Sequence, residues 1–227
     1  MDDTILDSHT AGERAWAEVA AGLAETLGKP VAAVRRELAS ANDWHWSDPA
    51  RALRGRLNQA AARVVIAGHA CESLGSDPSR VPSDLGQQFL QRRLHHLHPF
   101  AGALETLREL RTRGTALALV TNGEAGQQRE KIDKFDLGSF FDTVLVEGEL
   151  GYGKPDPRVF DLALERLGAT VGDTWIVGDD LEWEIGGGNR YGLTTVWVNA
   201  QGKDAPGTAQ PQPDLHVRLI AELLDLR

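Results

Sequence analysis

Residues 174–180, with the sequence TWIVGDD, form an apolar run that ends in two adjacent acids, Asp179 and Asp180. A short run of Trp, Ile and Val between turn residues predicts a β-strand that is buried on both faces. Open α/β sheets bind their ligands beyond the carboxyl ends of the strands, where these two carboxylates are expected to lie. Adjacent acids repel each other, and Mg²⁺, which prefers oxygen ligands, relieves that repulsion. The alternative is that Asp180 only caps the next helix and Asp179 is a solvated loop residue.

Strands and helices alternate through the second half of the chain. Apolar strands are predicted at 116–120, 143–146 and 194–198, in addition to the strand at Trp175, and helices at 100–113, 124–134 and 157–167. Such alternation is typical of parallel βαβ units. The sequence therefore predicts an α/β fold with a doubly wound parallel sheet.

From residue 10 to residue 97 the pattern is almost entirely helical. Four helices are predicted, starting near residues 10, 30, 48 and 83, and the third is expected to bury a stripe that includes Leu53, Leu57 and Val65. Several helices in a row without strands indicate a small bundle. We therefore expect an all-helical domain at 10–97, inserted into a core domain made of 1–9 and 98–227.

Composition excludes several classes of protein. The formal net charge of −9 argues against a surface for nucleic acid or an anionic membrane. The single cysteine, Cys71, permits no intrachain disulfide and is expected to be a buried apolar residue. No apolar run approaches the roughly 20 residues of a membrane span, and no signal peptide is evident. We expect a soluble, cytoplasmic, globular protein.

Polar residues of distinct types follow two further strands. Thr121 and Asn122 end the strand at 116–120, where backbone amides at the next helix can face an anion. Lys154 lies between Gly153 and Pro155, which restricts where its ammonium can reach. A hydroxyl, an ammonium and a metal ion are what a phosphoryl group needs around its oxygens. Thr121 as a helix cap and Lys154 as a surface charge are the alternatives, but their joint occurrence at successive strand ends favours one site.

Trp44, His45 and Trp46 form a compact aromatic group within the helical region. Packing at a helix junction is the simpler explanation, and a substrate pocket is the alternative.

The ordered motifs resemble those of the haloacid dehalogenase-like (HAD) hydrolase superfamily. Its four motifs are an N-terminal D-x-D-x-T, a strand ending in Thr or Ser, a Lys usually before Pro, and an acidic strand end. Thr121, Lys154 and Asp179 match the last three in order, and Glu184 follows the acidic strand end. The resemblance implies a Rossmann-like core, and the helical region resembles the cap found after the first motif. Two-component receiver domains are excluded because their lysine comes last.

The first motif is incomplete in this chain. Aligning Thr4 with the motif's Thr places Asp2 on its second acid, so that the first acid falls immediately before Met1. The strand leading into that acid, central in such sheets, is expected to be absent from this chain as well. Either the true start lies upstream or the protein is a natural truncation without a nucleophile. We favour the first explanation because the other motifs are intact.

The resemblance implies a Mg²⁺-dependent phosphatase that hydrolyses a small phosphorylated metabolite through an aspartyl-phosphate, with the chain as given inactive. The implied roles are Asp2 and Lys154 in catalysis; Thr121, Asn122 and Lys154 in phosphate binding; and Asp2, Asp179 and Glu184 in metal binding. Two alternatives stay open. One is a catalytically silent binding or structural module, and the other is a metal-independent 2-haloacid dehalogenase, which the pair of acids at Asp179 disfavours. The substrate and the oligomeric state are not predicted.

Overall fold

The computed structural model describes residues 1–226 and divides into two compact units. One is an α/β unit that joins Met1–Asp7 to the chain from His98 onward, and the other is a helical unit, Ser8–Leu97. The helical unit begins two residues before the predicted boundary because helix α1 already starts at Ser8. No helix within residues 1–226 is both long and apolar enough to cross a membrane.

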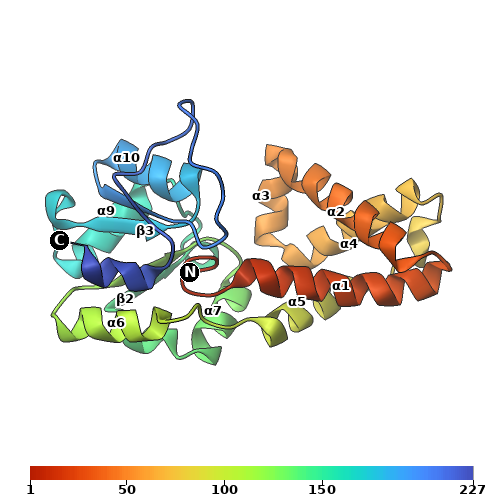
Figure 1. The fold of residues 1–227 in the computed structure, drawn as a ribbon, viewed down its shortest axis with the longest axis horizontal. Helices are drawn as coiled ribbons and strands as arrows, with labels where there is room; N and C mark the ends of the chain where they lie inside the picture. The colour runs from red at the N-terminus through yellow and green to blue at the C-terminus, as the bar shows by residue number, and fades with distance from the viewer. Residues whose placement is uncertain (227) are drawn as a thin grey trace. The chain divides into compact units, whose positions relative to one another are not determined.

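The α/β unit contains short parallel strands in two separate sheets (Figure 1). In one sheet β1 (Ala118–Thr121) pairs with β2 (Thr143–Val146). In the other, β3 (Trp175–Gly178) and β5 (Leu215–Val217) flank β4 (Thr194–Val198). All of these pairings are parallel, which confirms the predicted α/β class.

Helices precede β1 and lie between β1 and β2, β2 and β3, and β3 and β4, whereas residues 199–214 join the parallel strands β4 and β5 without a helix. The helices are α6 (Ala103–Thr112), α7 (Ala125–Lys134), α8 (Glu147–Leu150), α9 (Pro157–Leu167) and α10 (Gly187–Tyr191), with a π-helical turn, η4 (Leu181–Gly186), before the last. Short 3-10 turns are η2 (Leu137–Phe140), η3 (Val171–Asp173) and η5 (Ile220–Asp225). The apolar face of α9 is typical of the set: Val159, Phe160 and Ala163 are buried and pack in a cluster with Leu145 of β2. Apolar residues at helical spacing thus attach α9 to the strands.

A cavity of about 650 Å³ is lined by residues of both sheets. Leu119 and Val120 of β1, Ile176 and Val177 of β3, and Met1 contribute to its wall. The cavity thus borders two sheets that are not hydrogen-bonded to each other. The cavity also corrects one prediction: β3 is not buried on both faces, since Trp175, which lines the cavity, is 43% exposed.

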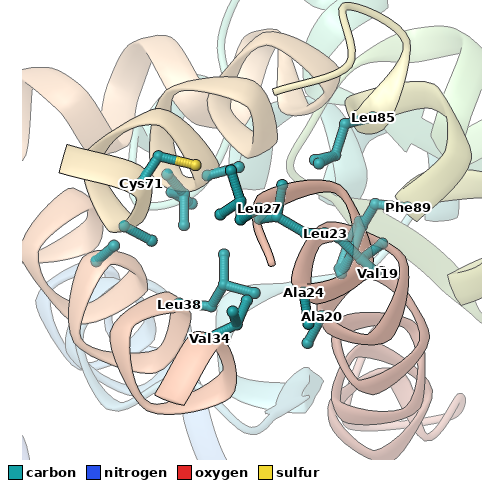
Figure 2. Close-up of a cluster of buried hydrophobic side chains, with 14 of the residues drawn as sticks. Val19, Ala20, Leu23, Ala24, Leu27, Val34, Leu38, Cys71, Leu85 and Phe89 are labelled. Atoms are coloured by element: carbon teal, nitrogen blue, oxygen red, sulfur yellow. The ribbon is translucent and has the colours of Figure 1, made fainter. Parts of the chain in front are cut away.

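The helical unit consists of α1 (Ser8–Leu27), α2 (Val31–Ser47), α3 (Pro49–Leu57), α4 (Gln59–Ser73) and α5 (Leu85–His96), with a 3-10 turn, η1 (Pro78–Arg80). Its core is a cluster of aliphatic side chains and Phe89 from α1, α2, α4 and α5 (Figure 2). Cys71 is buried within that cluster, as expected. The unit therefore has a hydrophobic core of its own.

The predicted third helix is wrong in one respect. The chain breaks at Asn58, whose side chain accepts a hydrogen bond from the Ala61 amide and so caps a new helix, α4. Leu53, Leu57 and Val65 are 50%, 46% and 47% exposed and do not form the expected buried stripe. The break explains the error, because a single helical period no longer runs across it.

Candidate active site

Lys154 lies at the carboxyl end of β1. Its Nζ donates a hydrogen bond to the Val120 carbonyl at 2.8 Å, directly before Thr121, and both Lys154 and Thr121 are buried. Asn122 fixes the lysine's backbone: its Nδ2 donates to the Lys154 carbonyl at 2.7 Å, and its Oδ1 accepts from the Lys154 amide at 2.9 Å. The peptide bond between Lys154 and Pro155 is cis. The loop thus brings an ammonium, a hydroxyl and an amide together at one strand end.

Glu184 links this strand end to that of β3. Its Oε1 accepts from Lys154 Nζ at 2.5 Å, and its Oε2 accepts from the Asp180 amide at 3.0 Å. Both members of the ion pair are buried. Burial raises the pKa of Glu184, but the Lys154 ammonium, the Met1 amino group and the hydrogen bonds from Lys154 and the Asp180 amide together hold that pKa below its ordinary value. Lys154 and Asp179 therefore lie at the same edge of the unit.

Gly178 gives Glu184 the space to reach this position. A Cβ at residue 178 would lie 1.9 Å from Glu184 Oε2. We expect Gly178→Ala to displace the Glu184 carboxylate and to lower the free energy of unfolding by about 1–3 kcal/mol, measured by urea denaturation. Gly172→Ala is the control, because a Cβ there meets no atom within 4 Å. Equal losses in the two variants would contradict this account.

Asp179 ends β3 and is held by residues far away in the sequence. Thr4 Oγ1 donates to Asp179 Oδ1 at 3.0 Å, and Trp197 Nε1 donates to the Asp179 carbonyl at 3.0 Å. Burial, followed by the negative charges of Glu184 and Asp3, raises the pKa of Asp179 to about 7. The chain's first residues and its fourth motif therefore meet at this carboxylate.

The raised pKa of Asp179 predicts a pH-dependent stability. Because folding raises this pKa from its ordinary 3.8 to about 7, the folded chain holds the proton more tightly and loses stability as pH rises through that interval. Without divalent cations, Asp179→Asn should therefore raise the free energy of unfolding at pH 8 by about 1–2 kcal/mol and change it little at pH 4. Urea unfolding at both pH values tests this. Asp180→Asn is the control, since asparagine also caps a helix. An equal gain in the free energy of unfolding at pH 8 in that variant would show that the pH dependence does not come from Asp179.

Asp2 pairs with a lysine that the sequence motifs did not indicate. Its Oδ2 accepts from Lys131 Nζ, on α7, at 2.5 Å. The Met1 amino group is buried nearby, and burial together with Lys154 lowers its pKa, while Glu184, Asp2 and Asp179 oppose the shift. The start of the described chain therefore lies among the predicted site residues.

The three predicted metal ligands do not form an acidic cluster. Within residues 1–226, no group of three His, Cys, Asp or Glu side chains is placed to hold a metal ion. Glu184 pairs with Lys154, and Asp2 pairs with Lys131. Asp179 fits a cation better, because the neighbouring acids leave an excess of negative charge around it. Of the three predicted ligands, Asp179 is the one whose surroundings favour a cation, and a Mg²⁺ site there would need further oxygen ligands.

Two further residues of the site were not predicted. Glu147 Oε2 accepts from the Gly123 amide at 2.8 Å and thereby shapes the turn after Thr121. Glu147 directly follows β2, so its strand-end position was a usable signal. The sequence around Lys131 offered no such signal, because a lysine within a polar helix is normally a solvated residue.

A sequence profile described as haloacid dehalogenase-like hydrolase matches residues 1–192. The chain belongs to this family. The resemblance drawn from the motifs is confirmed, and so is the assignment as a HAD-type hydrolase.

Characterised relatives of this HAD hydrolase are phosphatases. The phosphoserine phosphatase of Thermus thermophilus is 38% identical over 161 residues, which cover 71% of this chain and 63% of that protein. The N-acylneuraminate-9-phosphatase of Mus musculus is 36% identical over 150 residues, covering 66% and 60%. The glyceraldehyde 3-phosphate phosphatase of Methanopyrus kandleri is 32% identical over 157 residues, covering 67% of each. The match spans about three fifths of the length of the first two relatives.

Solved structures share the fold over almost the whole chain. The HAD-hydrolase YfnB from Bacillus subtilis, solved with bound magnesium, has a TM-score of 0.77 at 24% identity and covers 99% of this chain and 94% of its own. A HAD phosphatase from Thermococcus onnurineus has a TM-score of 0.64 at 26% identity and the same coverage.

Proposed function

We propose that this HAD hydrolase is a cytoplasmic Mg²⁺-dependent phosphatase of small phosphorylated metabolites. One observation carries the proposal: Lys154 Nζ lies 2.8 Å from the carbonyl that precedes Thr121 and 2.5 Å from Glu184, which also binds the amide after Asp179. A hydroxyl, an ammonium and an acid thus meet at one edge, the set that stabilises a phosphoryl group in transfer. Phosphatase relatives support the reaction class.

The nucleophile in this proposal is an aspartate joined directly before Met1. The Met1 amino group, where such a residue attaches, lies close enough to Lys154, Glu184, Asp2 and Asp179 to interact with their charges. Attachment also replaces that amino group with a neutral amide and removes a cation that competes with Lys154. The apolar cavity between β1 and β3 supports a strand in front of this aspartate. Without this aspartate and the strand in front of it, the 227-residue chain is proposed to be inactive.

Two displacements follow from this arrangement. The upstream carboxylate attacks phosphorus, the bond to the ester oxygen breaks, and Asp2 gives its proton to the leaving oxygen. Water then attacks the aspartyl-phosphate while Asp2 takes its proton, which releases inorganic phosphate and restores both acids. Lys131, 2.5 Å from Asp2, positions that carboxyl group. Thr121, Lys154 and the backbone at Asn122 hold the phosphoryl oxygens, since the Asn122 side chain is bound to the Lys154 backbone.

Asp179 and the upstream carboxylate are proposed to hold Mg²⁺, which supplies positive charge to the phosphoryl oxygens. Glu184 is a positioning residue for Lys154 rather than a ligand in this proposal, because its two oxygens already accept from Lys154 and the Asp180 amide. The helical unit, Ser8–Leu97, is proposed as the cap that excludes water and selects the substrate.

Thr121→Val tests the phosphate-binding role in a chain extended upstream with the aspartate. Loss of one hydrogen bond to a charged phosphoryl group should lower kcat/KM for p-nitrophenyl phosphate by about 10- to 100-fold. Thr143→Val, a buried threonine at the start of β2, is the control and should leave kcat/KM unchanged. If the extended chain folds but releases no phosphate, the phosphatase proposal fails, and metal-independent chloride release from a 2-haloacid would favour a dehalogenase.

A further inference from the structure

Arg63, on α4 of the helical unit, is a buried cation without an anionic partner. It is 8% exposed, and its Nε and Nη1 are buried and have no hydrogen-bond partner in the part of the chain that the structure describes. It forms no ion pair with any described Asp or Glu. Buried charges are normally paired, so a guanidinium in this state is unusual. It is more unusual in a chain with a formal net charge of −9.

Three aromatic rings lie close to the guanidinium. The Arg63 Cζ lies 4.7 Å from the ring centre of Phe89, 5.3 Å from that of Trp46 and 5.8 Å from that of Trp16. Phe89 is part of the aliphatic cluster in Figure 2, so one side of Arg63 rests on the core of the unit. Such contacts fix the orientation of the guanidinium. They do not satisfy its N–H donors.

Other positive or unsatisfied groups lie around Arg63. Burial, together with the charge of Arg93, lowers the pKa of Arg63 to about 9. His45, 4% exposed, has no hydrogen-bond partner on either ring nitrogen among the described residues, and its ring lies 5.0 Å from that of Trp46. Burial and the charge of Arg63 lower the pKa of His45. Asp48 opposes that shift, but its carboxylate already accepts a hydrogen bond from the Arg51 amide. Donors thus gather from α2, α4 and α5.

We propose that Arg63, with Arg93 and His45, binds a carboxylate or phosphate group of a small molecule within the helical unit. The planar guanidinium offers two parallel N–H donors that match either anion. The aromatic rings hold it rigidly, so that little freedom is lost on binding. The anion is either a second acidic group of the enzyme's own substrate or a separate metabolite. The site itself does not rest on the phosphatase chemistry.

Thermal unfolding with inorganic phosphate or malonate, against KCl at equal ionic strength, tests the site. Tm of the natural chain should rise by at least about 2 °C. Arg63→Met should abolish the rise, and Arg63→Lys, which keeps the charge but loses the paired donors, should reduce it. Arg35→Met, on the exposed surface of α2, is the matched control and should respond like the natural chain.

Several results would overturn the proposal. One is an unchanged Tm of the natural chain in both anions, and another is an equal rise in Arg63→Met, which would place the anion elsewhere. If Arg63→Met does not fold, Arg63→Lys decides, and a full rise in that variant counts against the site. Kinetics of the upstream-extended enzyme separate the two sources. If the anion belongs to the substrate, Arg63→Lys should raise KM for carboxylated phosphate esters but not for p-nitrophenyl phosphate. If the anion is a separate metabolite, Arg63→Lys should leave KM unchanged for both kinds of ester.

Discussion

An aspartate placed directly before Met1, behind a short apolar strand, should raise p-nitrophenyl phosphate turnover on the order of 10⁴-fold over the 227-residue chain in the presence of Mg²⁺. The added carboxylate attaches at the Met1 amino group, which lies within electrostatic reach of Lys154, Glu184, Asp2 and Asp179. Lys154 and Thr121 are already at the end of β1 to receive the phosphoryl oxygens. The large effect follows because a positioned nucleophile converts one difficult displacement into two easier ones.

The matched control carries asparagine in place of that aspartate. It adds the same strand and nearly the same side chain, so it should fill the cavity lined by β1 and β3. Its Tm should therefore rise above that of the unextended chain by as much as the Tm of the aspartate chain does. Its turnover should stay at the level of the unextended chain, because an amide neither attacks phosphorus nor contributes a charged metal ligand. Equal turnover in the aspartate and asparagine chains would show that the nucleophile lies elsewhere.

Lys154→Met should lower the free energy of unfolding by about 3–5 kcal/mol. Lys154 and Glu184 are both buried and 2.5 Å apart, so loss of the ammonium leaves the carboxylate buried without its cation. The Glu184 pKa, held low by Lys154, should rise in this variant. Its loss of stability should therefore be largest at neutral pH and smaller in acid, where Glu184 is protonated. Urea unfolding between pH 4 and pH 8 measures both effects.

Three further chains complete this experiment, one of them the single variant Glu184→Met. Lys154→Met combined with Glu184→Met removes both charges and should recover most of the lost stability, since an apolar pair of similar volume replaces a buried ion pair at little cost. Arg158→Met breaks the exposed pair with Asp156 and should have no measurable effect. If the double variant is as unstable as the sum of the two single variants, the two side chains are not coupled and the pair is misassigned.

Local patterns were sufficient for much of the fold. The strands at 143–146 and 194–198 were predicted with the bounds that the structure shows, because apolar, β-branched runs between turn residues depend only on neighbouring positions. Helix α9 was predicted equally well from Pro157, which starts it, and from its apolar spacing. The break at Asn58 was missed, because a side-chain cap outweighed a continuous apolar pattern.

The sequence by itself determined which residue types stand at the strand ends and in what order: Thr121, then Lys154, then Asp179. Only the tertiary structure decided their partners. It pairs Glu184 with Lys154, Asp2 with Lys131, and Thr4 with Asp179. It also buries Arg63 without an acid. The reason is that propensity and periodicity act over a few residues, whereas an ion pair between residues 129 positions apart depends on how separate elements pack.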